Sequence, residues 1–296
     1  MQLSYSRLLH KIHLHSSLIS IETTPLKLIN NKSAYLFFMK AAIFKGKGSI
    51  VIAERPYPTL KESKDAIVKV VMTTVCGSDL WYYRGISPYP QDYPIGHEFI
   101  GIVEKVGKDV KNVVEGDLVI APFFFSDNTC PHCKAGVTSA CENGGVWGID
   151  TDGAQGEAVR VPFADGTLVR IPKQDYPEEK LAALLTLTDV MCTGHYAAKC
   201  ANVRPGDTVA IVGDGAVGMC AIIASKRLGA NRIILVGSRN PARQKLAREL
   251  GATDIISDRG EEAVKKVMDL TNNVGVDASL ECVGTNEAMH MALAIA

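Results

Sequence analysis

Three of the eight cysteines of the chain crowd into one short segment, "SDNTCPHCKAGVTSAC", between Ser126 and Cys141. Cys130, Cys133 and Cys141 offer three thiolates, whereas a structural zinc site needs four ligands, usually Cys or His and sometimes Asp. Clustered cysteines in a chain of this size indicate metal binding in a reducing compartment, here the cytoplasm, rather than a secreted disulfide framework. A fourth ligand other than these three cysteines is therefore needed.

A second group of potential metal ligands is dispersed along the chain. The segment "VCGSD" contains Cys76 and Ser78, and "IGHEF" contains His97 and Glu98. Asp189 is the one charged residue of the apolar stretch "LAALLTLTDVMCTGHYAA", which is predicted to be helical. A carboxylate is costly there unless it binds a metal or is capped or paired locally. Cys, His and Asp at one zinc ion, with a fourth position open, is the composition of a catalytic zinc site.

The segment "VAIVGDGAVG" ends a predicted strand and begins a predicted helix. Its glycines, Gly213, Gly215 and Gly218, have the G-x-G-x-x-G spacing. Such glycines allow a tight turn and close approach of a pyrophosphate, which binds at the amino terminus of the helix. In this strand–helix context the motif predicts a dinucleotide site, although a glycine turn can also serve packing alone.

The end of the next predicted strand, "LVGSRN", bears on the choice of cofactor. An NAD site usually places Asp or Glu there to bind the ribose 2′-hydroxyl, but this chain has Gly237, followed by Ser238 and Arg239. A serine hydroxyl and an arginine fork can bind a 2′-phosphate, and Arg243 follows one turn later. NADP(H) is therefore predicted in preference to NAD(H), with a solvated Arg239 at the helix start as the alternative.

Two different patterns of elements position these residues. From Met39 to about Lys173 the chain consists of short strands rich in β-branched and aromatic residues, which predicts a β-rich, barrel-like domain. From about Pro177 strands and helices alternate, which predicts a parallel, doubly wound sheet. We expect domains over residues 39–190 and 191–296. Residues 1–38, with few acidic residues, are predicted to be a disordered or artefactual extension, with a transit peptide as a weaker alternative.

The overall charge and hydropathy exclude two classes of partner. Lys plus Arg and Asp plus Glu both number 32, so no net field favours nucleic acid or a membrane surface. No uncharged apolar run is long enough to span a bilayer. A small molecule is the expected partner.

Several motifs together resemble one protein family. The segment "GHEFIGIVEKVGKDV" fits the signature G-H-E-x2-G-x5-G-x2-V, and "CGSD", the cysteine-rich loop, "CTGHYAA", "GDGAVG" and "GATDII" follow in the family's order. From Met39 to Ala296 the chain resembles the zinc-dependent alcohol dehydrogenases of the medium-chain dehydrogenase/reductase superfamily. The resemblance implies a GroES-like catalytic domain followed by a Rossmann domain. Because only four strands of the nucleotide sheet can be found, we expect a chain truncated at its carboxyl terminus.

The resemblance also implies roles for individual residues. Cys76, His97 and Asp189 would bind the catalytic zinc, Glu98 would be an outer or alternating ligand, and Ser78 would relay the alcohol proton. In the family's structural zinc loop, four cysteines are spaced three, three and eight apart, and that spacing places Asp127 in the first position. The implied structural zinc ligands are Asp127, Cys130, Cys133 and Cys141, with His132 as an alternative fourth ligand and a loop without zinc as a further alternative.

The implied reaction is reversible hydride transfer between an alcohol and NADP(H), with the aldehyde or ketone as the product. Trp81 stands where many relatives have a histidine of the proton relay, so Ser78 is expected to pass the proton to water or a ribose hydroxyl. Asp at the third ligand position resembles the formaldehyde and polyol branches of the family, which remain alternatives. A truncated protein that binds zinc or nucleotide without turnover is a third alternative. The family's full-length members imply a homo-oligomer.

Overall fold

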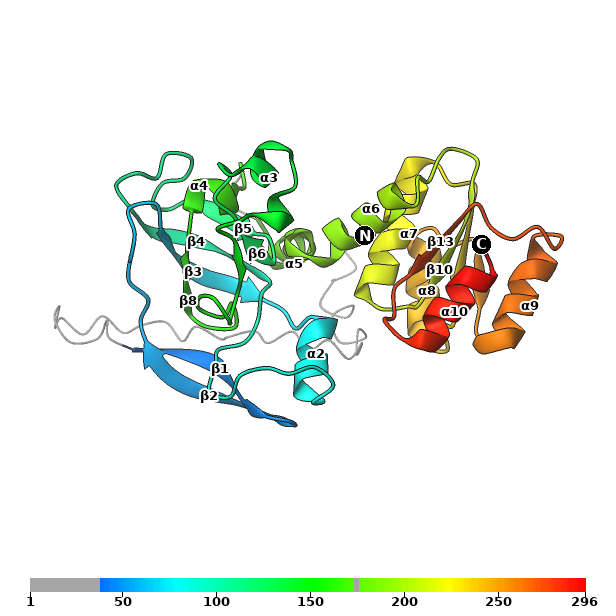
Figure 1. Ribbon diagram of the computed structural model, residues 1–296, viewed down its shortest axis with the longest axis horizontal. Helices are drawn as coiled ribbons and strands as arrows, with labels where there is room; N and C mark the ends of the chain where they lie inside the picture. The colour runs from blue at the N-terminus through cyan, green and yellow to red at the C-terminus, as the bar shows by residue number, and fades with distance from the viewer. Residues whose placement is uncertain (1–37, 173–175) are drawn as a thin grey trace, which may run out of the picture. The chain divides into compact units, whose positions relative to one another are not determined.

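The structure is a computed structural model that describes residues 38–172 and 176–296 (Figure 1). The described residues form two compact units, one ending at Asp189 and the other running from Val190 to Ala296. The extension predicted over residues 1–38 lies outside the described residues except for Phe38. Within the described ranges, no helix is long and apolar enough to cross a membrane.

The first unit is built on a five-stranded antiparallel sheet with the strand order β8-β3-β4-β5-β9. Two antiparallel sheets of two strands each, β1-β2 and β6-β7, accompany it. Side chains such as Phe99, Val119 and Trp147 are fully buried in its apolar core, as expected of β-branched and aromatic residues on pleated strands. The strands are β1 (Phe38–Gly46), β2 (Ser49–Pro56), β3 (Ala66–Thr73), β4 (Phe99–Val106), β5 (Leu118–Ala121), β6 (Phe124–Phe125), β7 (Gly145–Val146), β8 (Ala158–Val161) and β9 (Val169–Arg170).

The helices of the first unit are short, and the last of them corrects a prediction. Asp189 was expected inside one long helix, but α5 ends at Leu185, a 3-10 turn follows, and Asp189 adopts φ −147° and ψ −75° before the next helix begins. The aspartate therefore lies at a break in the helix, where its carboxylate is not constrained to a helix face. The helices are α2 (Gly77–Tyr83), α3 (Pro131–Lys134), η1 (Thr138–Ala140), α4 (Ala164–Thr167), α5 (Glu178–Leu185) and η2 (Thr186–Thr188).

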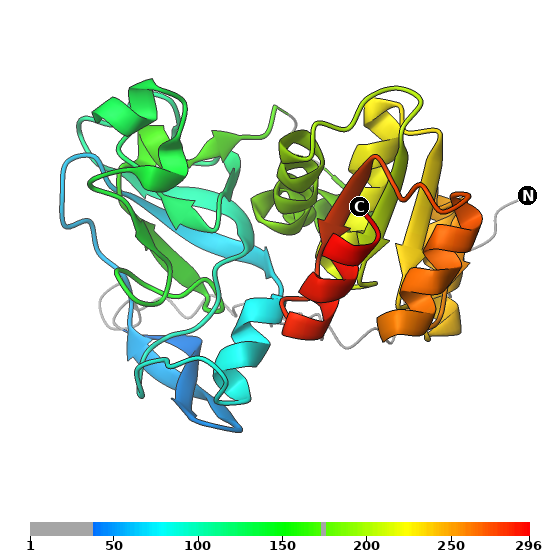
Figure 2. The ribbon, with the colours of Figure 1, turned by 45° about the vertical axis from the view of Figure 1, so that its right-hand side comes forward.

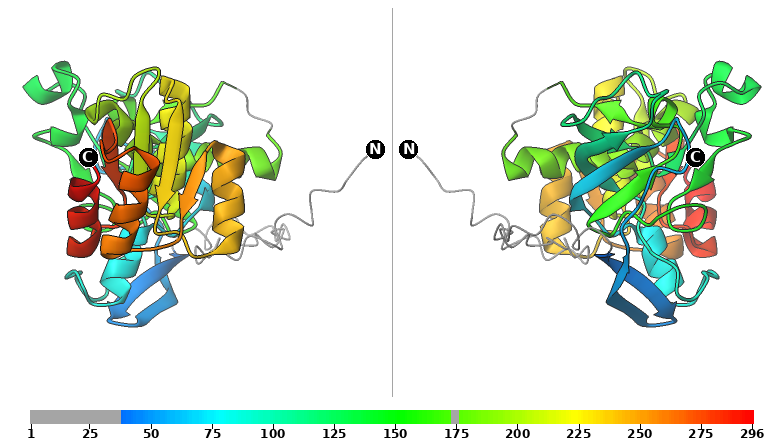
Figure 3. Two further views of the ribbon diagram at one scale, coloured as in Figure 1. Left: turned by 90° about the vertical axis from the view of Figure 1, so that its right-hand side faces the viewer. Right: turned by 90° about the vertical axis from the view of Figure 1, so that its left-hand side faces the viewer.

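The second unit is a four-stranded parallel sheet among the described residues, with the strand order β12-β11-β10-β13. Helices α6, α7 and α8 pack on one face of the sheet, and α9 and α10 pack on the other (Figures 2 and 3). Its elements are α6 (Val190–Cys200), β10 (Thr208–Val212), α7 (Ala216–Leu228), β11 (Arg232–Val236), α8 (Pro241–Leu250), β12 (Asp254–Ile256), α9 (Gly260–Leu270), β13 (Ala278–Glu281) and α10 (Asn286–Ala294).

The pattern of residues explains this arrangement. The two central strands, β10 and β11, are almost entirely apolar because a parallel sheet is covered on both faces. Strands and helices alternate as they must in parallel crossovers. The predicted fold class, a β-rich unit followed by a doubly wound parallel sheet, is confirmed.

Candidate metal centres and dinucleotide site

The register of β3 and β4 brings Cys76 and His97 to one edge of the antiparallel sheet. Thr73, which ends β3, pairs with Phe99, which begins β4. The hydroxyl of Thr73 also donates a hydrogen bond of 2.7 Å to the backbone carbonyl of Glu98. Residues just after β3 and just before β4 are therefore neighbours, although more than 20 positions separate Cys76 from His97 along the chain.

Asp189 reaches the same edge because α5 is anchored on the sheet. Leu185, at the end of the helix, is buried in an apolar cluster with Ile100 and Ile120. Thr188 follows and is also buried, and its hydroxyl lies 3.4 Å from Glu98 Oε2. The break after Thr188 then turns Asp189 toward His97.

Four potential ligands meet there: Cys76, His97, Glu98 and Asp189 each offer an atom within 4.8 Å of the others. Asp189 Oδ2 lies 3.5 Å from Cys76 Sγ and 3.3 Å from His97 Nε2. With Zn–S bonds of about 2.3 Å and Zn–N and Zn–O bonds of about 2.0–2.1 Å, neighbouring ligand atoms of a tetrahedral site lie about 3.3–3.5 Å apart. The donor set and its spacing fit a zinc ion.

Glu98 supplies a second sign that this site suits a cation. Its Oε1 is buried and has no hydrogen-bond partner among the described residues, which is costly for a carboxylate. Burial, reinforced by repulsion from Asp189, raises the pKa of Glu98 to about 7. A divalent cation beside this carboxyl group would offset both effects.

Asp79 is a member of this site that the sequence reasoning missed. Its side chain is 3% exposed; Oδ1 lies 3.5 Å from His97 Nδ1, and Oδ2 accepts a 2.9 Å hydrogen bond from the backbone N–H of Cys76. A carboxylate on Nδ1 holds a histidine with Nε2 free to bind metal. Asp79 stands three residues after the N-cap Cys76, which is capping-box spacing and the signal that could have revealed it.

The electrostatics of His97 follow from its two carboxylate neighbours. Burial lowers the pKa of His97, but the hydrogen bonds with Asp189 and Asp79 outweigh burial and raise the pKa above its ordinary value. Ser78 is exposed, and its hydroxyl lies 3.5 Å from His97 Nε2. The hydroxyl therefore lies beside the potential ligands and in contact with solvent.

The cysteine-rich loop forms a second cluster, in which Asp127, Cys130, Cys133 and Cys141 each offer an atom within 4.8 Å of the others. Cys130 Sγ lies 3.9 Å from Cys141 Sγ, close to the separation of about 3.8 Å for two thiolates on a tetrahedral zinc. His132, the alternative ligand, is instead half-exposed and lies 3.8 Å from Glu142 Oε1. The loop therefore brings the three thiols to Asp127 rather than to His132.

Local hydrogen bonds favour the ionised forms of two members of this second cluster, Asp127 and Cys130, whereas burial raises the pKa of Cys133. Asp127 Oδ1 accepts from the backbone N–H groups of Thr129 at 2.8 Å and Cys130 at 3.1 Å, and Oδ2 accepts from Asn143 at 2.6 Å. These hydrogen bonds hold the pKa of Asp127 well below its usual range. Backbone N–H groups directed at the Cys130 thiol lower its pKa as well. A carboxylate and a thiolate are the forms that bind zinc.

The glycine turn has the geometry that close approach of a ligand requires. Gly213 has φ +107°, and a Cβ added at Gly218 would lie 2.1 Å from the carbonyl oxygen of Gly213. Gly215 is the N-cap of α7, so the first N–H groups of this helix are directed toward the turn. The three glycines thus lie where a pyrophosphate would bind to the helix amino terminus.

Two residues after β11 contact Asp214 of the glycine turn, a contact that was not predicted. The Ser238 hydroxyl donates to Asp214 Oδ2 at 2.8 Å, and Arg243 Nη1 donates to Asp214 Oδ1 at 3.0 Å. Arg239 is exposed and donates from Nε to the carbonyl of Ser257 at 3.3 Å. Gly237 has φ +86°, so the position after the strand favours glycine over an acidic residue. The acidic second residue of "GDG" is the signal that was overlooked.

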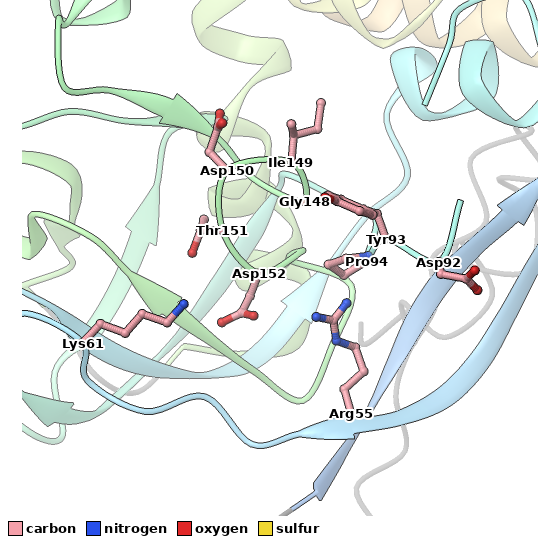
Figure 4. Close-up of a pocket in the computed structure, with 10 residues that line it drawn as sticks. All are labelled: Arg55, Lys61, Asp92, Tyr93, Pro94, Gly148, Ile149, Asp150, Thr151 and Asp152. Atoms are coloured by element: carbon pink, nitrogen blue, oxygen red, sulfur yellow. The ribbon is translucent and has the colours of Figure 1, made fainter. Parts of the chain in front are cut away.

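A separate cavity of about 270 Å³ lies elsewhere in the first unit (Figure 4). Its lining comes from Arg55, Lys61 and residues 92–94 and 148–152, and it shares no residue with either ligand cluster. The Arg55 and Lys61 side chains point toward the loop that carries Asp150 and Asp152. A cavity with five charged residues in its lining does not resemble the largely apolar pocket of a small-molecule site. The two ligand clusters are therefore the stronger functional candidates.

Comparison with known proteins gives the same picture. Residues 62–173 match the profile of the alcohol dehydrogenase GroES-like domain, and residues 216–296 match that of a zinc-binding dehydrogenase. One match lies in each of the two described units.

Individual relatives extend this result. The chain is 39% identical over 261 residues to a zinc-type alcohol dehydrogenase B of Aspergillus flavus, covering 85% of this chain and 59% of that protein. It is 33% identical over 276 residues to a glutathione-independent formaldehyde dehydrogenase of Bacillus subtilis, covering 85% and 67%. The structure of an alcohol dehydrogenase from Thermus sp. ATN1 superposes with a TM-score of 0.78 at 36% identity, covering 87% of this chain and 74% of that chain. The chain therefore belongs to the zinc-dependent alcohol dehydrogenases of the medium-chain dehydrogenase/reductase superfamily.

Proposed function

We propose that the protein is a zinc-dependent oxidoreductase that transfers a hydride between an alcohol and NADP(H). The observation that carries the proposal is the cluster of Cys76, His97 and Asp189, whose ligand atoms have the spacing of a tetrahedral zinc site. The glycine turn of the same chain supplies the cofactor half of the reaction. The GroES-like unit, over residues 39–190, would hold the metal, and the Rossmann unit, over residues 191–296, would hold the dinucleotide.

The reaction requires that the pKa of the alcohol hydroxyl be lowered and that a nearby group accept its proton. Zinc, when bound, supplies Lewis acidity that lowers the pKa of an alcohol or polarises a carbonyl group. Ser78 accepts the hydroxyl proton and releases it to solvent, to which its side chain is exposed. A dinucleotide held by the turn of Gly213, Gly215 and Gly218 would supply the acceptor for the hydride of the alcohol carbon, so that the product would be an aldehyde or ketone. Glu98, behind His97, provides a further carboxylate to the metal centre.

The second cluster is proposed to hold a structural zinc ion. Asp127, Cys130, Cys133 and Cys141 would close a four-ligand site without an open position. Its role would be to fix the loop between β6 and β7, which has few apolar residues of its own.

The choice of NADP(H) rests on the residues after β11. A carboxylate is absent at the end of that strand, and Ser238, Arg239 and Arg243 offer a hydroxyl and two guanidinium groups. These groups suit a 2′-phosphate.

The formaldehyde dehydrogenases provide the second candidate. The Bacillus subtilis relative carries that name, and Asp189 at the third ligand position resembles that branch. The substrate is in either case a small alcohol or carbonyl compound.

The experiment is an alcohol and aldehyde panel with NADP+ and NAD+, followed by the absorbance of the reduced nicotinamide. Asp189→Ala should abolish turnover, whereas Asp109→Ala, an exposed aspartate of the same unit, should leave it unchanged. A preference for formaldehyde would favour the second candidate. Zinc-loaded protein that oxidises no alcohol with either cofactor would refute the proposal and favour a binding protein without turnover.

A further inference from the structure

The carboxylate of Asp214 lies where the cofactor ribose would bind, although no acidic residue follows β11 directly. In the parallel register, Val212 pairs with Val236, so that Gly213 lies beside Gly237 and Asp214 beside Ser238. The carboxylate thus reaches the edge of the sheet from the glycine turn rather than from the end of the second strand. In an NAD site, a carboxylate at this edge accepts a hydrogen bond from the ribose 2′-hydroxyl.

The same carboxylate occupies two of the groups expected to bind a 2′-phosphate. Its two oxygens accept hydrogen bonds from the Ser238 hydroxyl at 2.8 Å and from Arg243 Nη1 at 3.0 Å. The Ser238 side chain is fully buried, so its hydroxyl cannot turn to solvent for another partner. A phosphate that approached Ser238 would come close to a like charge, which is unfavourable.

The site nevertheless keeps cationic groups that can attract a phosphate. Arg243 Nε is buried and has no hydrogen-bond partner among the described residues. Arg239 is exposed, and its one hydrogen bond of 3.3 Å is made through Nε to a backbone carbonyl. Arg259 also lies at this edge and donates from Nε to the carbonyl of Gly237 at 3.4 Å. Three guanidinium groups therefore surround the one carboxylate of Asp214, which leaves net positive charge to attract a phosphate.

We propose that Asp214 is the residue that determines cofactor preference in this chain. Its carboxylate accepts a hydrogen bond from the ribose 2′-hydroxyl of NAD(H) and repels the 2′-phosphate of NADP(H). Arg239 and Arg243 attract that phosphate, so that both cofactors bind. This inference rests on the proposed nicotinamide site. It adds that the Asp214 carboxylate, in the glycine turn, weakens the preference for NADP(H) over NAD(H).

The test measures the dissociation constants of NADPH and NADH for the full chain, from the fluorescence of the reduced nicotinamide, in wild type and Asp214→Asn. The asparagine keeps the size and the Ser238 hydrogen bond but removes the charge. The ratio of the NADH to the NADPH dissociation constant should rise at least tenfold. Asp214→Ser, which also removes the charge, should shift the ratio in the same direction and serves if the first variant does not fold by circular dichroism.

The matched control is Asp254→Asn. Asp254 also pairs with an arginine, Arg232, at 2.9 Å in the same unit, but both begin their strands and so lie at the opposite edge of the sheet. Its cofactor ratio should equal that of wild type. If both cofactors bind and the ratio is unchanged in a folded Asp214 variant, the inference is overturned while the nicotinamide site stands. If wild type binds neither cofactor, the proposed function fails and the inference fails with it.

Discussion

Asp79 is expected to govern zinc affinity without binding zinc. In Asp79→Asn, the amide oxygen would have to accept the 2.9 Å hydrogen bond from the Cys76 N–H, which leaves the amide NH₂ group facing His97 Nδ1. The NH₂ group favours the tautomer that carries its proton on Nε2, the nitrogen that faces Cys76 and Asp189. The substitution also removes a buried negative charge beside a dication.

Loss of such an outer carboxylate typically weakens metal binding by about 10–100-fold. That range corresponds to about 1.4–2.7 kcal/mol of binding free energy. We expect the upper part of the range here, because the Asp79 side chain is 3% exposed and water cannot replace the lost contact.

The assay is competition for zinc between the protein and a chromophoric chelator, with Asp109→Asn as the exposed control. The cysteine-rich loop provides an internal reference, since its zinc should be held as tightly as in wild type. An unchanged affinity at both sites in folded Asp79→Asn would refute the assignment of Asp79 as the group that orients His97.

Three further predictions concern the scaffold. Gly218→Ala should cost about 1–3 kcal/mol in urea unfolding and weaken NADPH binding, because its Cβ would lie 2.1 Å from the Gly213 carbonyl oxygen; wild-type values for both would contradict the close packing of the turn. The hydrogen bond from Arg232 lowers the pKa of Asp254, so this pair should add about 1 kcal/mol of stability above the ordinary carboxyl pKa and lose it as the pH falls through the lowered value. Stability curves of wild type and Asp254→Asn should therefore converge in acid, and parallel curves would argue against the pair. Trp147→Ala should cost about 3–5 kcal/mol, because this side chain is 3% exposed in the core of the first unit; a loss below about 1 kcal/mol would indicate a loosely packed core.

Much of the architecture could be predicted because it depends on local patterns. Apolar runs bounded by Gly and Pro gave the strands, and the glycine motif located the junction between β10 and α7. The long helix predicted around Asp189 was wrong, since apolar composition alone does not reveal a break in the backbone. Helix α10 was not predicted, although Thr285 accepts a capping hydrogen bond from the backbone N–H of Ala288 at its start.

The candidate sites were predictable in their ligands but not in their supporting contacts. Cys76, His97 and Asp189 stood out by residue type and by the order of motifs. The roles of Asp79 and Asp214 depend on which side chains face one another across strands and turns. Such contacts cannot be derived from a single sequence. Both residues lie within three positions of a predicted site residue. Their place near the sites could be predicted, but their hydrogen-bond partners could not.

The central claim is that two separate sets of side chains each hold one zinc ion. Elemental analysis of zinc per chain in wild type, Asp189→Ala and Asp127→Ala tests it most directly, with circular dichroism to confirm folding. The account predicts two zinc ions in wild type, one in each variant and none in the double variant. Two zinc ions in either folded single variant, or none in wild type, would contradict it.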